Sequence, residues 1–381
     1  MKNYQLSAKD LAAFFEKVLS NNLRLIAPIK VKQNESQNVT KLKNKAHILF
    51  REIPSKDDLK NIVIDAYTDM SAKEIFFPRS EPVIEYTNKK SGVVIKDIDP
   101  QAKETVLFGA RPCDAFGFSL LERLFSWDYD DPFFLKRREK TTVISLGCTS
   151  PLESCFCTSV GLSPMNTEGS DILFTPMSNN NNDKEDRYLV EVITPRGEKL
   201  IESIIGISSD LKNIFTEGNS LVQAKAAFEN KVKEQMKRKE DFKDITEILK
   251  YKFDDSQLES ETYRCLGCGV CSMVCPTCHC FDIVDEGEAS HGYRMKNWDS
   301  CSFALFTKHG GGHNPRDMQF KRCRQRYMHK LHYYREKFAD ALCVGCGRCV
   351  KACPVNLDIY SVVYNLKKAY ANNKNKEDKE K

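Results

Sequence analysis

Residues 265–280 read CLGCGVCSMVCPTCHC and contain six of the sixteen cysteines in the chain. The first four have the spacing C-x2-C-x2-C-x3-C, and a proline follows the fourth. Residues 343–354, CVGCGRCVKACP, repeat the same spacing and the same proline. A cysteine pattern that occurs twice in one chain indicates two related metal-binding loops.

The spacing matches the loops that hold [4Fe–4S] clusters in bacterial ferredoxins. There, the fourth cysteine of each loop ligates the other cluster. We therefore assign one cluster to Cys265, Cys268, Cys271 and Cys353, and the other to Cys343, Cys346, Cys349 and Cys275. Glycines between the cysteines allow each loop to wrap closely, with positive φ where needed. Zinc is the alternative, but structural zinc sites usually combine two C-x2-C pairs.

A second group of cysteines lies in the N-terminal half of the chain. Cys113 follows the strand-like run TVLFG, Cys148 follows TVISLG, and the loop SPLESCFC carries Cys155 and Cys157. Ligands gather beyond the carboxyl ends of strands in open α/β sheets. We therefore predict a third iron–sulfur cluster at these four cysteines. Buried structural thiols or a zinc site are the alternatives.

Charged residues flank this second group. Arg111, Arg137 and Arg138 are expected to balance the negative charge of a thiolate-ligated cluster, and Asp114 is expected to cap the helix after Cys113. With three clusters of the four-iron type the chain would carry about twelve irons.

Four cysteines are left over: Cys278, Cys280, Cys301 and Cys323. One hypothesis makes them a further metal site. The other, which we favour, is that Cys278, Cys280 and Cys301 line the cluster pocket. Their thiols would then act as weak donors that tune the reduction potential.

Composition is that of a globular protein, with 41% hydrophobic and 29% charged residues among 381. The net charge of +5 is small for this length and names no nucleic-acid or membrane partner. No apolar run approaches the roughly 20 residues of a membrane span. The N-terminus lacks the order of a signal peptide. We expect a cytoplasmic protein, in which cysteines bind metal rather than form disulfides.

The predicted fold class is α+β. Strands are expected at RLIAPIKV, AHILF, NIVIDAY, TVLFG and TVISLG, with a helix at 115–125. The expected domains are an N-terminal α/β domain (1–219), a helical linker (220–257), a mostly helical two-cluster ferredoxin-like domain with a long insertion (258–365), and a disordered tail (366–381). An Asn-rich run at 178–186 is expected to be an exposed loop.

The insertion and the upstream cysteines together resemble a known family. CPTCHCFDI, WDSC, FT-x2-GGG and RQR-x2-HK follow one another, and FGARPCDAFGFSLLERLF and GCTSPLESCFCTSVG lie upstream. This combination, over about residues 105–360, is similar to an iron–sulfur subunit found in two kinds of complex. In NAD(P)-linked nickel–iron hydrogenases (sulfhydrogenases) it is the beta subunit, and anaerobic sulfite reductase contains the corresponding iron–sulfur subunit.

The resemblance implies a non-catalytic electron-transfer subunit. It would relay single electrons from or to a reductase subunit that binds FAD and NAD(P)H. At the other end it would serve a catalytic hydrogenase or sulfite/sulfur reductase subunit. The chain itself has no G-x-G-x-x-G after a strand, so we expect it to bind neither flavin nor NAD(P). It also lacks the family's nickel-binding cysteine pairs and the sirohaem spacing.

Two other functions stay open. Residues 316–337 carry eight Lys or Arg and two acidic residues, interleaved with tyrosines, which is a pattern found in nucleic-acid-binding proteins. The commoner interpretation is a solvated or partner-facing helix, and we expect no nucleic-acid partner. The remaining alternative is a reductase with its own site at the surplus cysteines.

Overall fold

The computed structural model describes residues 2–31, 47–64, 66–177, 186–205, 215–254 and 256–380. These form two compact units. The first comprises 1–76, 101–151 and 163–236, and the second comprises 77–100, 152–162 and 237–381. This division falls at 236, whereas the sequence predicts boundaries at 219 and 257, and two N-terminal segments belong to the second unit. The Asn-rich run lies almost wholly outside the described residues.

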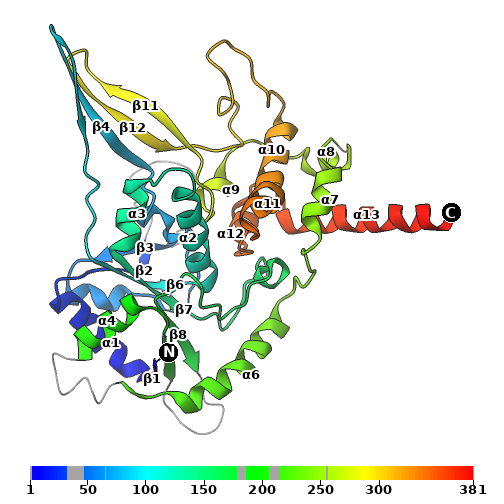
Figure 1. The fold of residues 1–381 in the computed structure, drawn as a ribbon. Coiled ribbons are helices and arrows are strands. Elements are labelled where there is room, and N and C mark those ends of the chain that lie inside the picture. Colours follow the sequence, from blue (N-terminus) through cyan, green and yellow to red (C-terminus); the bar gives the residue numbers. More distant parts are fainter. Residues whose placement is uncertain are drawn as a thin grey trace, which may run out of the picture. The chain divides into compact units, whose positions relative to one another are not determined.

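The first unit is built on an eight-stranded sheet with the order β10-β1-β9-β8-β7-β6-β2-β3 (Figure 1). Its four central strands are parallel: β2 (Arg24–Val31), β6 (Thr105–Ala110), β7 (Thr141–Leu146) and β8 (Ile172–Met177). The flanking strands pair antiparallel: β3 (His47–Ile53), β9 (Arg187–Val192), β1 (Lys2–Ser7) and β10 (Thr216–Glu217).

Both faces of the central strands are covered, which is why β6 and β7 are buried along their whole length. One face packs Val106 and Phe108 against apolar residues of α1 (Leu11–Ser20) and α4 (Pro195–Ile205). Leu107 alternates to the opposite side of the sheet and is also buried. The other helices of this unit are α2 (Pro112–Phe125), α3 (Pro132–Glu139) and α6 (Asn219–Gln235); α2 and α3 pack on β7 and on each other.

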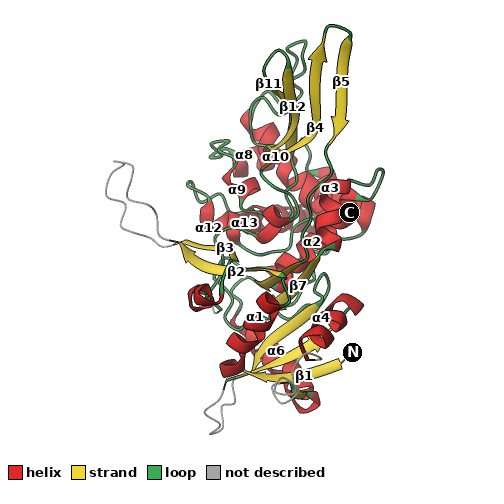
Figure 2. Cartoon of the chain, turned by 90° about the vertical axis from the view of Figure 1, so that its left-hand side faces the viewer, coloured by secondary structure: helices red, strands yellow, loops and turns green. Residues whose placement is uncertain are grey.

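The second unit contains a four-stranded antiparallel sheet that the sequence did not predict (Figure 2). Its order is β11 (Phe281–Gly287), β12 (His291–Trp298), β4 (Ser80–Lys89) and β5 (Gly92–Asp97). Two strands thus come from the insertion and two from the N-terminal half of the chain. The sheet adds to the helices of the second domain, and the predicted α+β class is confirmed.

The rest of the second unit is helical. Its elements are α7 (Ile245–Tyr251), α8 (Ser256–Thr262), α9 (Val270–Met273), α10 (Gln319–Met328), the π-helical segment η5 (His329–Tyr333), α11 (Tyr334–Phe338), α12 (Arg348–Ala352) and α13 (Ile359–Glu380). The predicted disordered tail is corrected, because α13 continues to Glu380. Val362, Val363 and Leu366 anchor this helix in the core, and the helix-favouring Lys, Ala and Glu residues beyond them extend it.

Most expected strands of the N-terminal region are present, and so is the helix predicted at 115–125. The strand expected at NIVIDAY is wrong. Instead, a 3-10 turn, η2 (Lys56–Asn61), occupies its start, and Ile62 makes only an isolated bridge to Ile29. The other 3-10 turns are η1 (Ala8–Asp10), η3 (Ala72–Ile75) and η4 (Cys157–Val160). Among the described helices, none is both long and apolar enough to cross a membrane.

Candidate metal centre

The two cysteine loops adopt the same backbone conformation. Gly267 and Gly269 in the first loop have φ of 69° and 72°, and Gly345 and Gly347 in the second have 62° and 74°. In each loop the second glycine directly precedes a short helix, α9 or α12, and these two helices pack against each other. The repeat in the sequence is therefore a repeat in the structure, with left-handed turns that favour glycine.

Cys275 lies beside the second loop. Two residues after it, the Thr277 hydroxyl donates to the carbonyl oxygen of Leu342 at 2.5 Å, immediately before Cys343. Lys330 Nζ lies 3.2 Å from Cys275 Sγ, and the charges of Cys275 and Cys343 both raise the pKa of this lysine. This arrangement supports the crossed assignment, in which Cys275 completes the ligand set of the second loop.

The first loop surrounds its leading thiol with hydrogen-bond donors. The Cys323 thiol, the Gly267 backbone N–H and the Gln319 amide at 3.3 Å all donate to Cys265 Sγ. These bonds and the nearby charge of Arg326 outweigh burial and lower the pKa of Cys265 to about 5. A thiolate is the form that binds iron, and the lowered pKa keeps Cys265 in this form at neutral pH.

The second loop is more deeply buried. Burial raises the pKa of Cys343, and it raises the pKa of Cys349 to about 12 against the opposing charge of Arg326. Such thiols are protonated unless a metal replaces the proton, which couples ligation to proton release. Cys353 beyond this loop accepts a bond from the Leu357 N–H at 3.2 Å.

Two buried cations stand among the cysteines. Arg326 on α10 is 5% exposed and Lys330 on η5 is 4% exposed. Burial lowers the pKa of each, but the neighbouring cysteines outweigh it and raise both pKa values: Cys271 and Cys349 for Arg326, and Cys275 for Lys330. A buried charge is costly unless it is paired.

Arg326 also bears on whether a cluster fits. Its Nε and Nη2 are buried and have no hydrogen-bond partner within the described part of the chain. Thiolate-ligated clusters carry negative charge, and their sulfurs accept hydrogen bonds. The orphaned donors and the surrounding cysteines therefore fit iron–sulfur clusters at these loops. When bound, such clusters accept and release single electrons, and the chain supplies ligands, charge balance and burial.

Cys155 and Cys157 lie against the second loop, within the second unit. The Phe156 N–H donates to the Gly345 carbonyl at 2.8 Å, and Cys155 Sγ lies 3.6 Å from the Cys346 carbonyl oxygen. A Cβ at Gly345 would come within 2.5 Å of the Cys157 nitrogen. Sequence reasoning placed these residues in an N-terminal domain, because this packing joins segments far apart in the chain.

Cys113 and Cys148 belong to the first unit. Cys113 is the second residue of α2, directly after β6, and Cys148 follows β7. Because β6 and β7 are parallel neighbours, both cysteines lie at the same sheet edge, as expected. Asp114 accepts the Arg111 backbone N–H at 3.4 Å and caps α2. The four-cysteine cluster of Cys113, Cys148, Cys155 and Cys157 stays a prediction.

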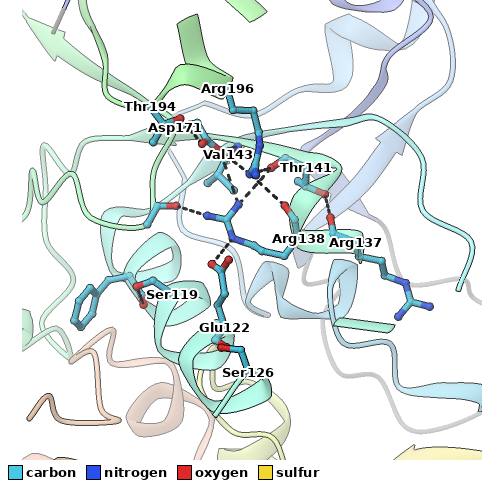
Figure 3. A network of polar contacts seen from close by, with 12 residues as sticks. Ser119, Glu122, Ser126, Arg137, Arg138, Thr141, Val143, Asp171, Thr194 and Arg196 are labelled. Atoms are coloured by element: carbon cyan, nitrogen blue, oxygen red, sulfur yellow. Dashed lines mark hydrogen bonds and ion pairs between the residues drawn. The ribbon is translucent and has the colours of Figure 1, made fainter. Parts of the chain in front are cut away.

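The arginines expected to serve that cluster make other contacts. Arg138 contacts Glu122 at 3.2 Å and Asp171 at 3.9 Å, and Arg196 joins the same network through Asp171 and Thr141 (Figure 3). These residues surround the start of β7, whereas Cys148 follows its end. The expectation for Arg138 is therefore corrected.

Arg111 and Arg137 also bond to the backbone of the first unit. Arg137 donates to the Phe76 carbonyl at 3.5 Å. Arg111 donates to the Gly147 carbonyl at 3.2 Å and to the Ala66 carbonyl at 3.2 Å, and it stacks on Tyr67. Sequence proximity to the cysteines could not reveal these backbone partners.

The surplus cysteines fall into two places. The Cys323 thiol is hydrogen-bonded to Cys265, and the thiols of Cys280 and Cys301 are hydrogen-bonded to each other. Cys278 lies close enough to Lys330 for its charge to raise the pKa of that lysine. No three His, Cys, Asp or Glu side chains of the described residues converge closely enough to hold a single metal ion. A cubane sets its ligands on separate irons, so it needs no such convergence. Arg326 and Lys330 are the functional residues that sequence reasoning missed as cluster neighbours.

Comparison with known proteins identifies residues 264–357 as a 4Fe-4S dicluster domain. Over 315 residues the chain is 29% identical to sulfhydrogenase 2 subunit beta of Pyrococcus furiosus, covering 82% of this chain and 87% of that protein. The chain is thus an iron–sulfur protein of the oxidoreductase class with a role in electron transfer. Together with the paired loops, these findings support the likeness to the iron–sulfur beta subunit of sulfhydrogenases that the sequence motifs indicate.

Proposed function

We propose that this chain is the electron-transfer subunit of an oxidoreductase complex. It relays single electrons between a reductase subunit that binds FAD and NAD(P)H and a terminal subunit that is a hydrogenase or reduces sulfur or sulfite. The relation to a sulfhydrogenase beta subunit supports partner catalytic subunits. We place its action in the cytoplasm, and we assign it no flavin, no NAD(P) and no catalytic centre of its own.

The packing of the two cysteine loops carries this proposal. α9 and α12 lie against each other, and Cys275 lies beside Cys343. In this arrangement each loop lends its fourth cysteine to the other cluster, so the two clusters are close neighbours. Short separation between one-electron carriers is what a relay requires.

Buried charge gives the relay a second support. The positive charge of Arg326 interacts with cysteines of both loops, Cys271 and Cys349. Arg326 is therefore placed to stabilise added negative charge on either cluster. The same observation weakens the nucleic-acid alternative, because Arg322, Arg326 and Lys330 of the basic segment are buried and cannot reach phosphates.

The experiment compares the isolated holoprotein with the complex purified anaerobically from its native source. Dithionite should reduce the clusters of the isolated chain, whereas NADH or NADPH should not. In the complex the same nucleotides should reduce them through the flavoprotein. Stoichiometric FAD in the isolated chain, or its direct reduction by NAD(P)H, would contradict the proposal.

The predicted N-terminal cluster is part of this proposal and has its own test. Three four-iron clusters correspond to about twelve irons per chain, and two correspond to about eight. Changing Cys113 and Cys148 to Ser should remove about four irons and leave the two loop clusters spectroscopically unchanged. An unchanged iron content would remove the N-terminal cluster and leave the relay intact.

A further inference from the structure

The β11–β12 hairpin brings two distant cysteines together at its base. Cys280 directly precedes β11, and Cys301 follows the end of β12. Phe281 pairs with Trp298, and the Asp299 N–H donates to the Cys280 carbonyl at 2.9 Å. The two thiols consequently meet and hydrogen-bond to each other.

The base of the hairpin is fixed to the first cysteine loop. Ser300, adjacent to Cys301, shares a 2.9 Å hydroxyl–hydroxyl bond with Ser272 on α9. Ser300 Oγ also accepts the Ser302 backbone N–H at 3.2 Å. Ser272 and Ser300 are fully buried, so these bonds hold Cys301 in one position beside the dicluster fold.

Cys278 lies near Lys330, the same buried cation that acts on Cys301. Thr277 beside it is anchored to Leu342 and lies 3.1 Å from Lys330 Nζ. The lysine therefore faces Cys275 of the second loop and Cys278 at once. Cys301 is also within the field of Lys330 and of Arg326. Cys278 and Cys301 thus lie near the same buried cation, and such a cation would balance thiolates on a cluster.

We propose that Cys278, Cys280 and Cys301 ligate a further iron–sulfur cluster at the base of the hairpin, next to the cluster of Cys343. This inference rests on the proposed function and extends its relay by one carrier. It replaces the interpretation favoured by the sequence, in which these three cysteines only line the pocket. Three thiolates suit either a three-iron cluster or a four-iron cluster with one iron lacking a cysteine.

The test uses the full chain, purified anaerobically, with Cys280 and Cys301 both changed to Ser. Iron content should fall by about three to four per chain, the content of one cluster, while the EPR signals of the two loop clusters remain. Cys323→Ser is the matched control, because Cys323, like Cys301, is buried and hydrogen-bonded to another cysteine thiol; it should lose no iron.

The outcomes separate this inference from the proposed function. If the double variant keeps all its iron while Cys275→Ser loses a cluster, the hairpin site is overturned and the two-cluster relay stands. If the double variant loses all its iron, Cys278→Ser decides, since it leaves the Cys280–Cys301 pair intact. Loss of one cluster then supports the site, and full iron content overturns it.

Discussion

The two cysteine loops share their spacing and their backbone turns, yet their surroundings differ. In the first, Cys268 and Leu266 are exposed, and residues of the insertion contact the loop: Gln319, Ser302 and Phe303. The second is covered by the backbone of residues 154–157, and Cys343 is buried. The motif therefore sets the ligands, whereas the covering segments set solvent access and hydrogen bonding, which tune cluster potentials.

The difference suggests a division of labour within the relay. The exposed first loop is the expected point of electron exchange with a partner, and the buried second loop is the expected internal carrier. Four predictions test this comparison, in order of decreasing effect.

Changing Cys275 to Ser should have the largest effect, because it removes a ligand from the cluster of the other loop. We expect loss of the second-loop cluster, about four irons, with the first-loop cluster retained. Cys353→Ser is the reciprocal variant and should affect the first-loop cluster. EPR of the reduced proteins distinguishes the two. If Cys275→Ser and Cys265→Ser abolish the same signal, each loop holds its own cluster independently.

Glycine-to-alanine changes should affect the loops unequally. Both Gly267→Ala and Gly345→Ala force a positive φ on alanine, which costs about 1 kcal/mol. At 345 the added Cβ also meets backbone atoms of Phe156 and Cys157 at 2.5 Å, whereas at 267 the nearest atom, at 2.6 Å, ends the flexible Gln319 side chain.

The second-loop variant should therefore lose about 1–3 kcal/mol more. Thermal unfolding of the anaerobic holoproteins measures the difference in the free energy of unfolding. Equal losses for the two alanine variants would mean that segment 154–157 does not press on the second loop.

Arg326→Gln should lower the reduction potentials of both loop clusters, because it removes a buried positive charge near Cys271 and Cys349. A shift of about 60 mV, equivalent to a tenfold change in a one-electron equilibrium, is expected. Lys330→Gln should act mainly on the second-loop cluster. Redox titration followed by EPR provides the measurement, with Arg326→Lys as the charge-preserving control. Unshifted potentials in Arg326→Gln would show that its charge is not felt by either cluster.

Cys323→Ala should produce the smallest effect. It removes one thiol donor to Cys265 and should lower the potential of the first-loop cluster by on the order of tens of millivolts, with iron content unchanged. Cys323→Ser keeps a hydroxyl donor and should shift less. A larger shift in the potential of the second-loop cluster than of the first would contradict the hydrogen bond between Cys323 and Cys265.

The sequence by itself determined the parts whose geometry is local. The cysteine spacing and its glycines specify the two loops, and the apolar runs around 105–110 and 141–146 specify β6 and β7. Even the placement of Cys113 and Cys148 at one sheet edge could be predicted, because neighbouring parallel strands end at the same edge. These features depend on residues that are close in the chain, so their pattern survives in the sequence.

Only the tertiary structure decided which segments surround the loops. β4 pairs with β12, a strand far from it in the sequence, and segment 154–157 covers the second loop. Arg326 and Lys330 are buried, although they belong to a segment whose sequence resembles a basic surface. Strand pairing and burial depend on contacts between distant residues, and a lysine or arginine has the same letter whether it faces solvent or a cluster. The physical reason is that the strength of a charge's interactions depends on its burial and on its neighbours, and only the tertiary structure gives these.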